Sequence, residues 1–349
     1  MSECSDLYDK LFPHIKFGIS IGGFVLTFIN IVTFSRIIKE NNLKDNLFKY
    51  LLTKSINDFY IITDNILFGV IDLYFKKSIE KYYPFCIFRF IIDEYIGFSC
   101  QLISMFCEVA SCFNRYRSVS NRFKFFDKIH IGFKLSILFI YSGMFYSYKL
   151  FQKRCKMYQS FNSSVEIVWK LEHYQHFLNT PIDFAFSLIH SLIRDGLCSL
   201  FIICLNIMLF FRMSQFYTNK IRLNKSKTSN KKSDKEMKLE KQQKNLVYMV
   251  LATSTFTLIG HILMFVYYLP FEVIANNRCL RMFSLIFFYL SISINFVSYF
   301  IFNLHFRKFI LFNLFRSVSR VTFGYFKFDH EKNELSLSTL AKSSTTNLK

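Results

Sequence analysis

Long runs of apolar residues, separated by short polar segments, recur along the whole chain. The central parts of three runs contain no Lys, Arg, Asp or Glu. Because an α-helix needs about 20 apolar residues to cross the hydrocarbon core of a bilayer, these runs predict membrane-spanning helices near 15–37, 245–269 and 282–304.

Four further apolar segments carry a few ionisable residues and are weaker candidates for spans. They lie near 47–73, 87–114, 131–151 and 184–211. A backbone in lipid must satisfy its own hydrogen bonds, so each segment is expected to be helical. The pattern therefore predicts an all-α integral membrane protein, with a bundle of seven transmembrane helices within residues 15–316.

The segment after the last span has a different pattern. Apolar residues recur there at helical spacing beside Arg307, Lys308 and Arg316. This predicts a short amphipathic eighth helix at 305–316 that lies on membrane lipid. The polar residues 317–349 are expected to form a cytoplasmic tail.

The distribution of charge predicts the orientation. The loops 36–49, 115–134 and 219–244 together hold 20 Lys and Arg against 6 acidic residues, whereas the segments on the other side hold 13 against 10. Basic loops normally stay in the cytoplasm. We therefore expect residues 1–14 outside the cell. The sequon at Asn162 then lies outside and is the predicted glycosylation site, whereas the sequon at Asn224 lies inside.

The composition limits the class of protein. The chain is 52% hydrophobic and has a formal net charge of +20. This apolar content argues against a soluble or disordered chain. Since the basic residues gather in loops between spans, we expect a multi-pass plasma-membrane protein and no nucleic-acid partner. The chain lacks the metalloprotease, P-loop, serine-hydrolase and paired-cysteine motifs, so neither an enzyme nor a metal centre is predicted.

Short motifs in three of the predicted helices resemble those of one receptor family. Asn114-Arg115-Tyr116 ends the third span, Asn295-Phe296-Val297-Ser298-Tyr299 lies in the seventh, and Ser55-Ile56-Asn57-Asp58 lies in the second. Together they resemble the motifs of a divergent rhodopsin-like (class A) G-protein-coupled receptor, nearest to invertebrate chemosensory or FMRFamide-like peptide receptors. Phe296 stands where the family has Pro, and Asn114 where it has an acid.

The resemblance implies roles for these residues. The switch that faces a heterotrimeric G protein would comprise Asn114, Arg115, Tyr116, Asn295 and Tyr299. An isolated Arg at a helix end also reaches lipid phosphates without any such role, which is the alternative for Arg115.

The resemblance also implies a polar network in the membrane that holds a sodium ion. Its members would be Asn30, Asp58, Ser104, Ser291 and Asn295. The alternative is a set of polar contacts that only pack the helices together.

Several residues near the outer ends of the third and fifth spans are candidates for binding an extracellular ligand, namely Glu94, Gly97, Arg194 and Asp195. By the resemblance, Gly97 occupies the position where amine receptors carry Asp, which disfavours a biogenic amine. Basic residues in the loop 149–183 favour a peptide or an acidic ligand. Salt bridges between helices are an equally good explanation of the charged candidates.

Four of the nine cysteines are predicted on the oxidising, outer side. We favour a disulfide between Cys86 and Cys155, which would tie the second outer loop to a helix, and consider a Cys4–Cys279 bridge or free thiols as alternatives.

The expected function is transduction of an extracellular ligand, a peptide or a chemosensory small molecule, to a G protein. The alternative is a seven-span ligand-gated channel or transporter. Insect-type odorant receptors also have seven spans but the opposite orientation, so the side of the N-terminus discriminates between the two.

Overall fold

The computed structural model describes residues 11–41, 46–75, 79, 81–120, 123, 125–160, 166–173, 181–226, 234–269 and 277–312. The chain divides into two units, Met1–Arg307 and Lys308–Lys349. The helices and strands named below belong to the first unit. A short helix at 304–312 contains the boundary between the units.

Among the described residues, five segments are helical, long and apolar enough to cross a membrane: Phe12–Lys39, Tyr83–Ser120, Phe184–Gln215, Lys244–Tyr267 and Cys279–Phe302. Three of these segments lie in single helices, α2 (Phe12–Asn41), α12 (Asp234–Tyr268) and α14 (Arg278–Phe302). The other two lie in long helices with a π-helical stretch, labelled η, in the middle. They are α5 (Tyr83–Arg89), η2 (Phe90–Gly97) and α6 (Phe98–Ser120), and α10 (Pro181–Ser191), η3 (Leu192–Leu197) and α11 (Cys198–Ser226). The chain is therefore a helical, multi-pass membrane protein.

Two of the seven predicted spans are not among these five segments. The span near 47–73 is α3 (Asn46–Val70) with η1 (Ile71–Phe75), a long helix with several charged residues. The span near 131–151 is α8 (Ile131–Tyr146), which ends five residues earlier than predicted because Ser147 bonds back to the Met144 carbonyl. Its 16 residues cover about 24 Å. Short helices α7 (Phe125–Lys128) and α9 (Lys149–Gln152) flank it. Seven spans stay a prediction.

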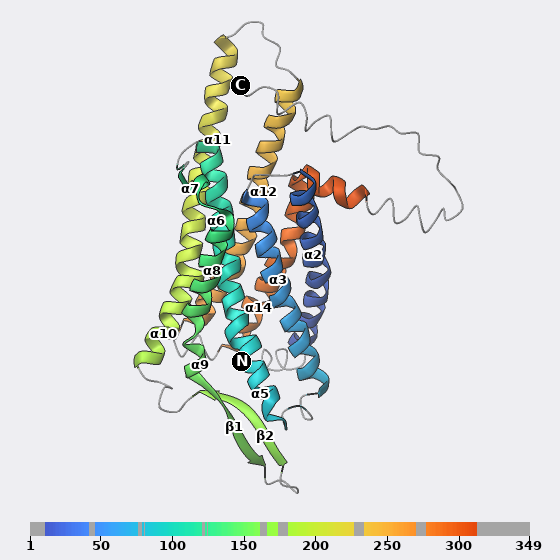
Figure 1. Cartoon of the computed structure of the whole chain (residues 1–349), viewed down its shortest axis with the longest axis vertical. Coiled ribbons are helices and arrows are strands. Elements are labelled where there is room, and N and C mark those ends of the chain that lie inside the picture. The colour runs from blue at the N-terminus through green and yellow to red at the C-terminus, as the bar shows by residue number, and fades with distance from the viewer. Residues whose placement is uncertain are drawn as a thin grey trace, which may run out of the picture. The chain divides into compact units, whose positions relative to one another are not determined.

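The long helices lie side by side in one bundle (Figure 1). α3 contacts α2 and α6, α6 also contacts α8 and α11, and α14 contacts α2 and α12. Glycines allow the closest approaches. A Cβ added at Gly23 would lie 2.7 Å from Oγ of Ser293, and one at Gly260 would lie 2.7 Å from Oγ of Ser291. Small residues at such contacts are typical of helices that pack in membranes.

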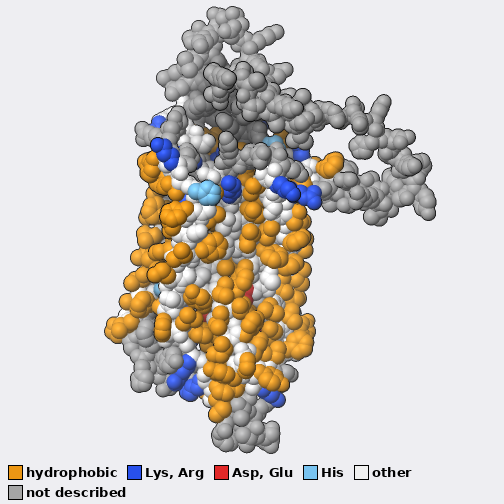
Figure 2. All heavy atoms as spheres, viewed as in Figure 1, with side chains coloured by type: hydrophobic (Ala, Val, Ile, Leu, Met, Phe, Trp, Pro, Cys, Tyr) orange, Lys and Arg blue, Asp and Glu red, His pale blue; other side chains and the backbone are white. Residues whose placement is uncertain are grey.

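The surface of the bundle is apolar and many polar residues are inside. Hydrophobic side chains cover most of the face seen in Figure 2, and large ones such as Met144 and Phe210 are 72% and 63% exposed. Lys54, Asp58, Glu108, Arg194 and Asp195 are each at most 3% exposed. This distribution, the reverse of that in a soluble protein, is expected where lipid surrounds the helices.

A β-hairpin lies at one end of the bundle, which we call the hairpin end (Figure 1). Strands β1 (Lys153–Ser160) and β2 (Glu166–His173) are antiparallel, with Cys155 opposite Leu171 and Met157 opposite Trp169. This segment was predicted to be a loop. The alternation of Ile167, Trp169 and Leu171 with polar or smaller residues is the signal that indicates a strand.

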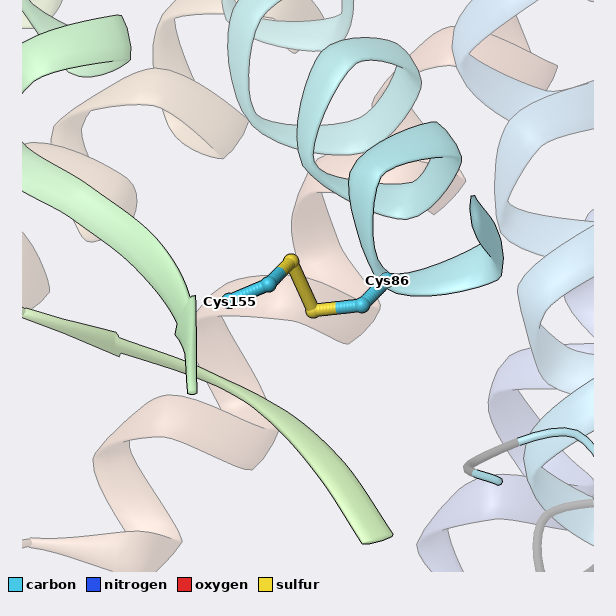
Figure 3. The surroundings of a disulfide bond; sticks show 2 residues. All are labelled: Cys86 and Cys155. Carbon is cyan, nitrogen blue, oxygen red and sulfur yellow. A yellow bond between two sulfur atoms is a disulfide. The ribbon is translucent and has the colours of Figure 1, made fainter. Parts of the chain in front are cut away.

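Three contacts attach the hairpin to the helix that begins with α5. Cys86 on α5 and Cys155 on β1 form a disulfide, with their Cα atoms 6.0 Å apart (Figure 3). Lys153 pairs with Glu94 on η2, and Trp169 packs on Tyr83. The disulfide expected from the sequence is thus present. Cys279 is also disulfide-bonded, whereas Cys4 and the sequon residue Asn162 lie outside the described residues.

Candidate functional site

A cluster of buried charged side chains lies in the middle of the bundle, and we call it the Lys54 cluster. Nζ of Lys54 lies 3.0 Å from Oδ2 of Asp58, one helical turn away on α3, and 3.9 Å from Oε2 of Glu108 on α6. Ser104 donates to Oδ1 of Asp58 at 2.6 Å, and Thr253 on α12 donates to Oε1 of Glu108 at 3.2 Å. All five side chains are at most 5% exposed. The cluster thus links three helices.

The geometry of Asp58 tests whether a sodium ion fits here. Both carboxylate oxygens already have a protein donor, from Lys54 and from Ser104. A hard cation needs several oxygen ligands that are free to face it. The residues present therefore do not fit a sodium ion at Asp58, because the ammonium group of Lys54 occupies the place of the cation.

The other residues predicted for the sodium network do not bond to Asp58. Ser291 donates to the carbonyl of Phe288 at 2.7 Å. Oδ1 of Asn30 and both polar side-chain atoms of Asn295 are buried and have no hydrogen-bond partner among the described residues. The structure thus joins Asp58 to Ser104, and of the other three only Ser291 lines the same cavity as Asp58.

A second buried cluster, the Arg194 cluster, lies closer to the hairpin end. The guanidinium of Arg194 donates to Oδ2 of Asp195 from Nε at 2.9 Å, and to Gln101 on α6 from Nη1 at 3.1 Å. Oδ1 of Asp195 lies 2.7 Å from Nδ1 of His261 on α12. Asp195 is 1% exposed. These residues, predicted as ligand contacts, hold η3, α6 and α12 together.

A small cavity connects the two clusters. Its volume is about 10 Å³, and its walls include Lys54 and Asp58 from one cluster and Gln101 and His261 from the other. A cavity of this size holds about one water molecule. Side chains of both clusters therefore line one cavity, together with the apolar Ile61, Phe288 and Ile292.

The predicted switch residues of α6 lie at the end opposite the hairpin. Arg115 is 4% exposed, and Tyr116 is 7% exposed. Oδ1 of Asn114 accepts a hydrogen bond from Arg117 at 2.8 Å. The side-chain oxygen of Asn114 therefore bonds within α6, to a residue less than one turn further along.

Of the predicted switch residues on α14, Tyr299 packs against α2 and against the helix that follows α14. Tyr299 is 1% exposed, and its ring lies 4.9 Å from Phe34 and 5.8 Å from Phe306. With Phe296 in place of Pro, α14 keeps all its backbone donors and continues to Phe302. Asn303 then caps the next helix by accepting from the Phe306 amide at 3.1 Å.

The two remaining ligand candidates lie at the hairpin end. Glu94 pairs with Lys153, so it holds the hairpin. Gly97 faces a carboxylate on the neighbouring helix, since a Cβ added there would lie 3.8 Å from Oδ2 of Asp64.

Two larger cavities open near this end. One of about 240 Å³ is lined by Phe98, Tyr146, Tyr148, Lys149, Ser187, His190, Ser191, Arg194, Tyr267 and Leu269. The other, of about 540 Å³, lies among α2, α3, η1, α5, η2 and α14 and contains Lys16, Asp64, Asp72, Arg89 and Asp93. Of the four candidates, Arg194 alone lines one of these two cavities.

Lys54 and Glu108 are not among the site residues predicted from the sequence. Lys54 stands four residues before Asp58, a spacing at which opposite charges on a helix meet. That signal was available in the sequence. The third member, Glu108, lies on another helix, and its contact depends on how α3 and α6 pack.

No protein-family model matches this chain, and no curated protein sequence matches it. The resemblance to a receptor family therefore rests on the motifs alone, while the long apolar helices and the buried clusters are features of the structure.

Proposed function

We propose that this chain is a plasma-membrane receptor of the rhodopsin-like type, which passes a signal from an extracellular ligand to a heterotrimeric G protein. The observation that carries the proposal is the pair of buried polar clusters, which line one cavity between the hairpin end and Glu108. Glu108 precedes Arg115 by seven residues, so both lie on the same face of α6. A change at the hairpin end would pass through these groups toward the family's switch motif at the other end.

The proposal includes seven spans. α3 lies between α2 and α6, and its charged residues Lys54 and Asp58 face the interior rather than lipid. α8 packs on α6 and exposes Phe133, Ile140 and Met144. Both features support two more membrane crossings, with α8 assisted by local thinning of the bilayer. The hairpin end would then face outward.

Signalling in cells tests the proposal. Cells that express the wild-type chain should show second-messenger output above that of untransfected cells, and Arg115→Ala should abolish it. Arg212→Ala is the matched control, because Arg212 is another basic residue near the same end and its bond to Gln215 is exposed. Equal output from wild type and Arg115→Ala, at equal surface expression, would reject the switch.

A channel or transporter is the second candidate. Chains of buried Asp, Glu and His also occur in proton and ion pathways. However, the cavity between the two clusters has a volume of only about 10 Å³, which is room for about one water molecule rather than a pore. A membrane current that persists when G proteins are blocked would favour this alternative.

A further inference from the structure

We propose that Glu108 is a proton-binding site inside the bundle. Its carboxyl group carries a proton at neutral pH and releases it when the ion pair between Lys54 and Asp58 is broken. Glu108 is 0% exposed and lies on α6, which contacts both α3 and α12. The inference concerns the Lys54 cluster itself, so it applies to a receptor and to a channel alike and does not rest on G-protein coupling.

The two carboxyl groups of the cluster are unequally supplied with hydrogen-bond donors. Asp58 accepts from Nζ of Lys54 at 3.0 Å and from Ser104 at 2.6 Å, so each of its oxygens has one donor. Oε2 of Glu108 lies 3.9 Å from Nζ of Lys54, beyond hydrogen-bond distance, and has no hydrogen-bond partner among the described residues. A buried carboxylate that lacks donors is costly, and such a group binds a proton instead.

The remaining contact of Glu108 suits a protonated carboxyl group. The hydroxyl of Thr253 has a single hydrogen, yet two acceptors lie within its reach, the Val250 carbonyl at 3.1 Å and Oε1 of Glu108 at 3.2 Å. A proton on Oε1 reverses the second bond, because Glu108 then donates to the Thr253 oxygen while Thr253 donates to Val250. A threonine in a helix commonly bonds back to the preceding turn in this way.

The proton also balances the charges around Glu108. Lys54 and Asp58 then form one ion pair, and Glu108 is neutral. The other titratable groups that interact with Glu108 are two thiols of its own helix and one phenol of α14, those of Cys107, Cys112 and Tyr299. None of them is a cation. Among the described residues, Lys54 is therefore the cation nearest to Glu108, and it lies closer to Asp58.

Loss of the ion pair reverses this preference. In Asp58→Asn the ammonium group of Lys54 is still buried, and Glu108 is the acid left beside it. A nearby opposite charge favours the ionised form of a carboxyl group, so Glu108 should then give up its proton. Proton release from α6 is thereby linked to the ion pair on α3.

Infrared spectroscopy of the purified full-length chain in lipid nanodiscs tests the proposal. A protonated carboxyl group has a C=O stretch above the amide band, and this stretch moves when the carboxyl carbon is carbon-13. At neutral pH the wild type should show an acid band that moves when the glutamate carboxyl groups are labelled by cell-free synthesis, since exposed glutamates are ionised. Glu108→Gln should lack this band. Glu94→Gln, which removes a carboxylate paired with Lys153, should keep it.

Asp58→Asn should also lose the band, although Glu108 is still present. A wild type without a glutamate-sensitive acid band would overturn the inference, and this comparison needs no variant to fold. An acid band of the cluster that moves with labelled aspartate instead would place the proton on Asp58 and overturn it as well. A band that remains in Glu108→Gln would show that another glutamate carries the proton, and one that remains in Asp58→Asn would refute the link to the ion pair.

Discussion

Lys54 and Asp58 form an ion pair of 3.0 Å in the middle of the bundle, where their side chains are 2% and 5% exposed. The pair shares its cation with Glu108, 3.9 Å away on the next helix. One ammonium group thus lies beside two carboxyl groups on two helices, and this has consequences for stability and for ion sensitivity.

Lys54→Met should destabilise the protein strongly, because it leaves the buried carboxylate of Asp58 without a cation. Loss of one partner from a buried pair costs about 3–5 kcal/mol. The double variant Lys54→Met/Asp58→Asn should recover much of this loss, and Lys49→Met, on the same helix but only half-buried, should have little effect. Thermal unfolding in detergent measures all three. Equal unfolding temperatures for Lys54→Met and Lys49→Met would contradict the role of the pair.

Sodium should not change the basal activity of the wild-type chain, because the ammonium group of Lys54 holds the cation position at Asp58. Replacing choline chloride by sodium chloride at constant ionic strength should leave basal nucleotide exchange unchanged. In Lys54→Met the site is vacated, and sodium should then lower exchange. A sodium effect in the wild type that disappears in Asp58→Asn would show that a sodium ion binds there after all.

The hydrophobic pattern predicted most helices because a bilayer imposes length and polarity on each span. The sixth span, predicted at 245–269, matches the apolar segment Lys244–Tyr267. Its helix α12 begins earlier, at Asp234, because the added turns are rich in Lys, Glu and Gln, which favour helix but carry no membrane signal. The pairing of β1 with β2 was not predicted, because residues 166–173 lie between two spans and were assigned to a loop despite their alternating apolar residues.

The candidate site was less predictable than the fold. The motif residues directed attention to Asp58 and Arg115, but a sequence motif does not say which groups meet. The Arg194–Asp195 pair was predicted as a ligand contact, and the structure adds two hydrogen-bond partners on other helices, His261 and Gln101, that the sequence did not indicate. Such contacts depend on how each helix is rotated about its axis. Hydrophobic periodicity shows which face of a helix turns inward but not which side chains on that face meet.

Asn114→Asp should lower basal coupling. Its acceptor now binds Arg117, and a carboxylate has the capacity to hold Arg115 and Arg117 together in the inactive arrangement. A stabilisation of about 1.4 kcal/mol would reduce a small active fraction about tenfold. Basal second-messenger output at matched surface expression measures the effect. Asn114→Asp/Arg117→Ala should keep the reduction, since Arg115 remains; output equal to wild type in both variants would exclude this site as a determinant of the balance.

The disulfide should stabilise the hairpin end. Cys86→Ser and Cys155→Ser should each reduce the stability by about 2–5 kcal/mol, and the double variant should cost no more than either single change. Cys204→Ser, which alters an exposed free cysteine, is the control. Unfolding with and without reductant measures the difference, and additive losses in the double variant would argue against a shared bond.

The orientation predicts accessibility from outside the cell. An epitope tag at residue 2 should be stained on intact cells, and Asn162→Gln should abolish glycosylation while Asn224→Gln leaves it unchanged. Staining that requires permeabilisation would reverse the topology and favour the channel alternative.

The most direct measurement of the central claim is nucleotide exchange on purified heterotrimeric G proteins, with the full-length chain reconstituted in lipid nanodiscs. The account predicts that the wild type accelerates GTPγS binding by at least one class of G protein over empty nanodiscs, that Arg115→Ala removes this acceleration, and that Arg212→Ala retains it. Exchange that stays at the level of empty nanodiscs with every class of G protein, or that is equally fast with Arg115→Ala, would contradict it.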